Sequence, residues 1–144
     1  VVDNEMLPLG ESALFMLLRT LSPVGDATFV ALHPLAFAGW LGLFFTALNL
    51  FPVSQLDGGH VVFALTRRAH RAVGILTLAL LLALSFGWIG WLVWAGLVMA
   101  IGRGRLHHPP VWDPGLRLDP VRRAVAWACI AIFLLTLVPI PFPT

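Results

Sequence analysis

Charged side chains are scarce in this sequence of 144 residues: they make up 11% of the chain, and none of them is a lysine. Soluble domains usually carry about 25% charged residues, so the composition argues against an ordinary soluble domain. Hydrophobic residues account for 59% of the chain, and the mean hydropathy is +0.91. We therefore predict an all-α integral membrane protein with about four membrane-embedded segments.

A basic face and a second cysteine are also lacking. The nine arginines exceed the seven acidic residues by only two, and they lie between apolar blocks. This distribution argues against a nucleic-acid partner. The single cysteine, Cys129, lies within an apolar run, which excludes an internal disulfide and a cysteine-based metal site.

The beginning of the chain lacks the pattern of a signal peptide, because no basic residues precede a short apolar stretch. The chain also starts at Val1 rather than at a methionine. We expect it to be a piece of a longer protein, folded as a single membrane domain over residues 1–144. Residues 1–26, which include a short helix from Gly10 to Leu21, are predicted to lie at the membrane interface.

Three long stretches contain no charged residue: 27–56, 72–102 and 124–144. A single helix over 72–102 would be about 46 Å long, against a hydrocarbon core of about 30 Å, so we predict a hairpin there. Arginines flank the hairpin on both sides and place both of its ends on the cytoplasmic side. The predicted order is an interfacial segment at 1–26, an interrupted helix at 34–68, the hairpin at 72–102, a cytoplasmic loop at 103–121 and a final helix at 122–139. Trp88, after the turn of the hairpin, is expected either at the far interface or packed within the hairpin.

Polar residues interrupt the apolar helix predicted at 34–68. Pro52 removes a backbone donor and disfavours helix at the preceding residue, so we predict that the helix unwinds over residues 50–57. Irregular backbone at membrane depth is tolerated where protein or a water-filled cavity surrounds it. Asn49, Ser54 and Gln55 are therefore expected to line a cavity.

Asp57 is the only formal charge between residues 27 and 66. If residues 58–67 are helical, its carboxylate lies about 15 Å from the cytoplasmic arginines, near the middle of the membrane. An ionised group there costs at least about 2.5 to 3.5 kcal/mol, which a metal ion, an opposite charge or trapped water would offset. Gly58 and Gly59 allow a helix or an ion to approach this carboxylate closely.

Simpler roles for these polar residues remain open. Asp57 could cap the helix that follows it, since aspartate is a favoured N-cap residue. Asn49 could satisfy the backbone of its own broken helix. His60 is more often a packed or hydrogen-bonded histidine than a metal ligand.

In this region the chain resembles the site-2 protease family of intramembrane zinc metalloproteases. The resemblance rests on an Asn-x-x-Pro motif followed by Leu-Asp-Gly-Gly, here Asn49, Pro52, Leu56, Asp57, Gly58 and Gly59. The flanking runs Leu7–Ser12 and His33–Trp40 are also similar to bacterial and plastid members. The resemblance implies that Asp57 is a zinc ligand and that Asn49 positions the substrate backbone or the oxyanion. Pro52, Ser54 and Gln55 would then contact an extended segment of the substrate, a role that we infer from the unwound backbone.

The family's His-Glu-x-x-His signature, which supplies two zinc ligands and the general base, is absent from this sequence. We therefore expect the chain to be the C-terminal half of such a protease, inactive by itself. Its expected partners are the N-terminal half of the same protein, which holds the remaining Zn²⁺ ligands, the lipid bilayer and transmembrane-helix substrates. A bacterial cytoplasmic membrane is the expected location.

Two other classes of protein remain as alternatives. Half of an ion-coupled transporter or channel would also use a broken helix with a mid-membrane carboxylate, but it predicts an inverted repeat that the sequence does not show. A pseudoprotease or membrane scaffold would explain the missing signature, but not the cost of burying Asp57.

Overall fold

The computed structural model describes residues 9–21, 34–106, 112 and 117–143. Every regular element within these residues is a helix, which confirms the all-α class. The helices are α1 (Ala13–Leu21), α2 (Pro34–Asn49), α3 (Asp57–Leu65), α4 (His70–Leu84), α5 (Gly90–Ile101) and α6 (Pro120–Thr136). The expectations for residues 1–8, 22–33, 107–111 and 113–116 lie outside the described part of the chain.

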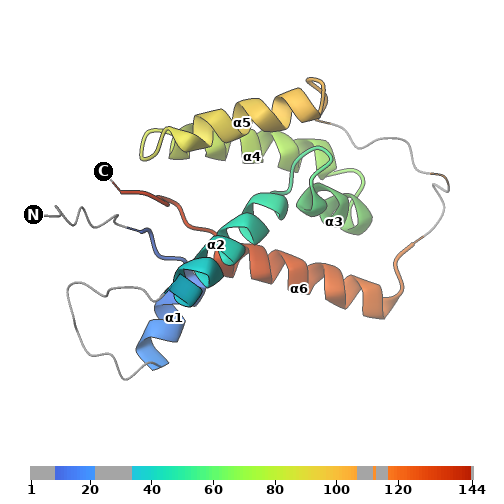
Figure 1. Cartoon of the computed structure of the whole chain (residues 1–144). Coiled ribbons are helices and arrows are strands. Elements are labelled where there is room, and N and C mark those ends of the chain that lie inside the picture. The colour runs from blue at the N-terminus through green and yellow to red at the C-terminus, as the bar shows by residue number, and fades with distance from the viewer. Residues whose placement is uncertain (1–8, 22–33, 107–111, 113–116, 144) are drawn as a thin grey trace, which may run out of the picture.

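The helices form two packed groups, with α3 between them. Helices α4 and α5 pack side by side, and α6 contacts α1, α2 and α3 (Figure 1). Helix α3 also contacts α4, so this short helix joins the α4–α5 pair to α6. We refer to the segment between α2 and α3, residues 50–56, as the break.

Local sequence explains where several of these helices begin and end. Pro34 and Pro120 each occupy the first position of a helix, where the missing backbone N–H is not needed. The Asp119 carboxylate caps α6 by accepting a 2.8 Å hydrogen bond from the backbone N–H of Arg122. Helix α2 ends at Asn49, three residues before Pro52, as the restriction that proline places on its predecessor leads us to expect.

The predicted membrane crossings are not supported by these helices. In the described ranges, none of the helices is both long and apolar enough to cross a membrane. The longest are α6 with 17 residues and α2 with 16. Helices occupy the predicted ranges 34–68, 72–102 and 122–139, and non-helical residues divide each of the first two into shorter helices.

An aromatic core holds the helices together. Trp91 of α5 is fully buried, and its indole N–H donates a 2.7 Å hydrogen bond to the carbonyl oxygen of Pro139. Half-buried Trp88 packs against Phe44, Trp91 and Phe142, with ring centroids 5.6 to 6.4 Å apart. Trp88 thus packs against α2 and the segment after α6 as well as within the hairpin, and its place at the far interface stays a prediction. These rings connect α2 and α5 to the segment that follows α6.

Candidate functional site at the break between α2 and α3

The break lies where the sequence predicts the helix to unwind. Helix α2 ends at Asn49 and α3 begins at Asp57. The backbone N–H of Val53 donates to the carbonyl oxygen of Phe51 at 2.8 Å, and that of Leu56 donates to Val53 at 3.2 Å. Two tight turns therefore satisfy part of the non-helical backbone and leave the motif residues on a compact loop.

Two apolar side chains of the break point into the core. Phe51 and Val53 are fully buried. The ring of Phe51 packs edge-on against Trp91 of α5 and Phe133 of α6, with centroids 5.5 and 5.0 Å apart. Edge-to-face aromatic pairs of this kind add about 0.5 to 1.5 kcal/mol beyond the burial itself. The break is thus anchored to both helix groups.

Ser54 is also buried, with 2% of its surface exposed. Its hydroxyl donates a 3.1 Å hydrogen bond to the carbonyl oxygen of Arg105, in the segment after α5. Its φ angle is +50°, in the left-handed region that favours glycine. The side chain ties the break to residues beyond α5, and the contact of Ser54 with substrate stays a prediction.

The two glycines of the motif pack against the backbone of the break. A Cβ atom on Gly58 would collide with the carbonyl oxygen of Leu50. A Cβ atom on Gly59 would lie only 2.5 Å from the carbonyl oxygen of Ser54. We expected these glycines to admit another helix or an ion. Instead, the chain's own backbone occupies the space that their missing side chains leave.

The polar residues Asn49, Gln55 and Asp57 face outward and are exposed. Because Gly58 lies against Leu50, the two ends of the break meet, and Asn49 and Asp57 each lie one residue before the point of contact. Asn49 and Asp57 therefore stand next in sequence to the point where the two ends of the break meet. Pro52, which lies between Asn49 and Gln55 in the sequence, is half-buried. His60 is exposed in the first turn of α3.

Helix capping does not explain Asp57. The N-cap residue of α3 is Leu56, and no side chain makes a cap hydrogen bond there. Asp57 occupies the first turn of α3, where a negative charge interacts favourably with the helix dipole by about 0.3 to 1 kcal/mol. Within the described residues its carboxylate takes part in no ion pair, which leaves both oxygens available to a ligand.

The described residues do not form a complete zinc site. No group of three or more His, Cys, Asp and Glu residues among them is arranged to hold a metal ion. A catalytic zinc ion is usually bound by three protein ligands, and Asp57 with His60 supplies two at most. The carboxylate is chemically suited to zinc, but the fit is partial, so any zinc ion here needs ligands from outside these residues.

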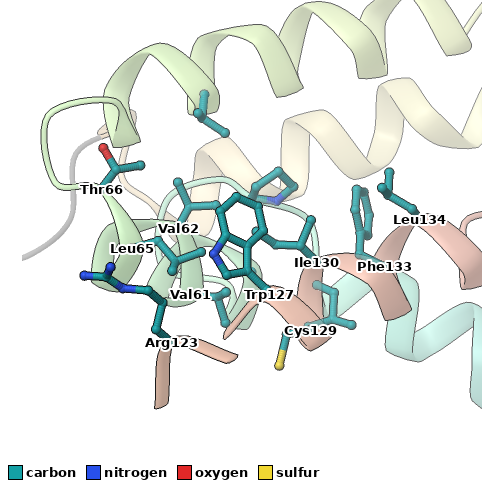
Figure 2. Close-up of a pocket in the computed structure, with 14 residues that line it drawn as sticks. Val61, Val62, Leu65, Thr66, Arg123, Trp127, Cys129, Ile130, Phe133 and Leu134 are labelled. Atoms are coloured by element: carbon teal, nitrogen blue, oxygen red, sulfur yellow. The ribbon is translucent and has the colours of Figure 1, made fainter. Parts of the chain in front are cut away.

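An apolar pocket of about 590 Å³ lies beside the break, between α3 and α6 (Figure 2). The break contributes Leu50 and Pro52, and α3 contributes Gly58. Most of the remaining lining comes from Val61, Leu65, Trp127, Ile130, Phe133 and Leu134. Sequence reasoning found Pro52 but missed the α6 residues, because no local pattern links positions about 70 residues apart.

Comparison with known proteins identifies the family of the chain. The profile of peptidase family M50 matches residues 13–87, a range that contains the whole break and both glycines. The chain belongs to this family, the site-2 protease family, as the Asn-x-x-Pro and Leu-Asp-Gly-Gly residues led us to expect. This assignment argues against the transporter alternative.

Three similar proteins come from plants, and their names describe them as chloroplastic. The chain is 34% identical over 115 residues to the "probable zinc metalloprotease EGY1, chloroplastic" of Arabidopsis thaliana, covering 79% of this chain and 21% of that protein. It is 36% identical over 118 residues to the protein of the same name in Oryza sativa subsp. japonica, covering 79% and 20%. It is 40% identical over 82 residues to the "probable zinc metallopeptidase EGY3, chloroplastic" of Arabidopsis thaliana, covering 56% and 14%.

The chain thus spans about a fifth, or less, of the length of these relatives. No solved structure gives a significant match. The expected bacterial location finds no support in the comparisons, since these relatives carry chloroplastic names.

Proposed function

We propose that this chain is the C-terminal part of an intramembrane zinc metalloprotease and that it contributes Asp57 as one ligand of the metal. The proposal rests on the carboxylate of Asp57 in the first turn of α3, which is exposed and makes no helix-capping hydrogen bond. It lies in the region that the profile of the peptidase family matches. The remaining Zn²⁺ ligands would come from the N-terminal half of the same protein. We expect the 144 residues by themselves to bind zinc weakly and to be inactive.

The proposed substrates are proteins with transmembrane helices. Asn49, which is exposed at the end of α2, would hold the substrate backbone or stabilise the oxyanion by hydrogen bonding. Gln55 is exposed and Pro52 lines the neighbouring pocket, so these two residues would contact the unwound substrate. Because Ser54 is buried against Arg105, its proposed contribution is to hold the break in shape.

Membrane embedding is supported by the apolar outer surface of the helices. Large hydrophobic side chains that are at least half exposed occur on several helices, among them Leu76, Val93, Val125 and Leu134. Scattered apolar residues are normal on a soluble surface, but here they accompany a composition that is 59% hydrophobic. We propose a multi-pass membrane location, with the loop at 103–121 on the cytoplasmic side.

The decisive experiment substitutes Asp57 with alanine in the complete protein. We expect Asp57→Ala to abolish cleavage of a reporter substrate with a transmembrane helix and to lower the zinc content of the purified protein. Glu11→Ala is the matched control, because Glu11 is a partly exposed carboxylate distant in sequence from the break and paired with Arg19 at 2.9 Å. Expression and membrane insertion should be the same in both variants.

Two results would contradict this assignment. Full cleavage by Asp57→Ala would show that the carboxylate is not a ligand. Absence of cleavage in the complete wild-type protein, with a normal fold, would favour the pseudoprotease or scaffold alternative. In addition, tight stoichiometric zinc binding by the 144 residues alone would reveal ligands that the described residues do not bring together.

A further inference from the structure

The pocket between α3 and α6 has two chemically different ends. Figure 2 shows Arg123 and Thr66 at one end and Phe133 and Leu134 at the other. The guanidinium of Arg123 and the hydroxyl of Thr66 are the strongly polar side-chain groups of the lining, and aliphatic or aromatic side chains provide most of the rest. The pocket is therefore amphipathic along its length.

Its size suits a hydrocarbon chain. A volume of about 590 Å³ lies within the range of roughly 300 to 1,000 Å³ that is typical of small-molecule sites in proteins. Water in an apolar pocket finds few hydrogen-bond partners, so an apolar ligand that displaces it is favoured. An unbranched chain could follow the gap between the two helices from Arg123 towards Phe133.

Arg123 supplies positive charge at the polar end of the pocket, and other arginines are near it or near Thr66 in the sequence. Arg67 and Arg68 follow the last residues of α3, and Arg122 and Arg123 belong to the first turn of α6. Asp119 balances Arg122, at 3.5 Å. No ion pair of Arg123 is present among the residues that the structure describes, so its charge is available to an anion at the mouth of the pocket.

We propose that this pocket binds an anionic phospholipid, with one acyl chain between α3 and α6 and the phosphate beside Arg123. A guanidinium is well matched to phosphate because it donates two parallel hydrogen bonds. The complementarity of one cationic end and one apolar end favours a charged amphiphile over a neutral lipid or a purely apolar ligand. The pocket shares Pro52 with the proposed substrate contact, but its cationic end lies at Arg123, and the proposal stands even if Asp57 binds no metal.

The test measures lipid retention by the complete protein purified in detergent. Native mass spectrometry would follow dioleoyl phosphatidylglycerol and dioleoyl phosphatidylcholine offered at equal concentrations. We expect retention of phosphatidylglycerol and about a tenfold loss of that retention in Arg123→Gln, because a charge-assisted hydrogen bond is removed. Ile130→Trp, which fills the middle of the pocket, should cause a similar loss.

Arg103→Gln is the matched control, since Arg103 is an exposed arginine after α5 that does not line the pocket. Its retention of phosphatidylglycerol should equal that of the wild type. Equal losses in Arg103→Gln and Arg123→Gln would show general surface charge and overturn the proposal. Equal retention of the two lipids would show no selectivity for a net negative headgroup and would overturn the proposal of an anionic phospholipid.

A photo-crosslinking side chain at position 134 identifies the occupant directly and does not depend on the folding of Ile130→Trp. Leu134 lines the pocket and is 63% exposed, so a larger side chain fits there. We expect crosslinks to phospholipid in membranes. Crosslinks to a polypeptide instead would show that a protein segment fills the pocket and would overturn the proposal.

Discussion

The two sides of the break differ in almost every physical respect. The inward side consists of Phe51, Val53 and Ser54, all buried, together with the glycines that pack against them. The outward side consists of Asn49, Gln55 and Asp57, all exposed. Both sides come from the eleven consecutive residues 49–59, and we propose that they serve two different purposes.

This difference separates residues that hold the motif from residues that we propose carry its chemistry. The inward residues fix the conformation through aromatic packing, one hydrogen bond and close backbone contact. The outward residues make few contacts with the rest of the described chain. Substitutions on the inward side should therefore lower the free energy of unfolding, and those on the outward side should lower activity alone.

The largest effect on stability is expected for Phe51→Ala. Removal of a fully buried ring leaves a cavity between Trp91 and Phe133, and such substitutions cost about 3 to 5 kcal/mol. Phe45→Ala is the control, because Phe45 is 58% exposed on α2. Thermal unfolding in detergent should show a large loss for the first variant and little for the second. Similar losses would mean that Phe51 does not anchor the break.

A second, smaller loss is expected for Gly58→Ala. The added methyl group meets backbone atoms of Leu50 and Phe51, which cannot rotate away as a side chain could. Overpacking of this kind costs about 1 to 3 kcal/mol. Gly39→Ala, in α2, meets nothing within 4 Å and should stabilise the helix by about 0.5 to 1 kcal/mol. If the two alanine variants unfold at the same temperature, the close contact between α3 and the break does not exist in solution.

Ser54 permits a finer comparison of two substitutions. Ser54→Ala loses the hydrogen bond to Arg105 and keeps the left-handed backbone, so it should cost about 1 kcal/mol. Ser54→Gly loses the same bond but relieves a backbone strain of about 1 to 2 kcal/mol, so it should be close to neutral. Denaturant unfolding of both variants measures the difference. A glycine variant less stable than the alanine variant would contradict the strained conformation.

The position of the break was predictable from local chemistry. Pro52 restricts the residue before it and removes a donor, and these effects act whatever the rest of the chain does. The family was predictable for a related reason: Asn49, Pro52 and Asp57 with its two glycines form a distinctive short motif, and the matched region contains them all. The helical class followed from composition.

The sequence does not predict which residues of the motif are buried or what they contact. The sequence shows that Ser54 is polar but not that its hydrogen-bond partner is the carbonyl oxygen of Arg105, 51 residues away. Likewise, the glycines were expected to admit a helix or an ion, and only the fold shows that residues 50–54 fill that space. The pocket beside them depends on the pairing of α3 with α6, which no local pattern specifies.

The smallest change in stability is expected for Asn49→Ala, where the effect should appear in catalysis. Asn49 is exposed at the end of α2, and surface substitutions usually change stability by less than about 0.5 kcal/mol. If its amide stabilises the oxyanion in the complete protease, cleavage of a reporter substrate should fall by about 100-fold or more. Thr46→Ala is the control, because the exposed Thr46 hydroxyl donates only to Gly42 in its own helix. Loss of cleavage in proportion to loss of stability would place Asn49 among the structural residues, and the two sides of the break would then no longer differ in purpose.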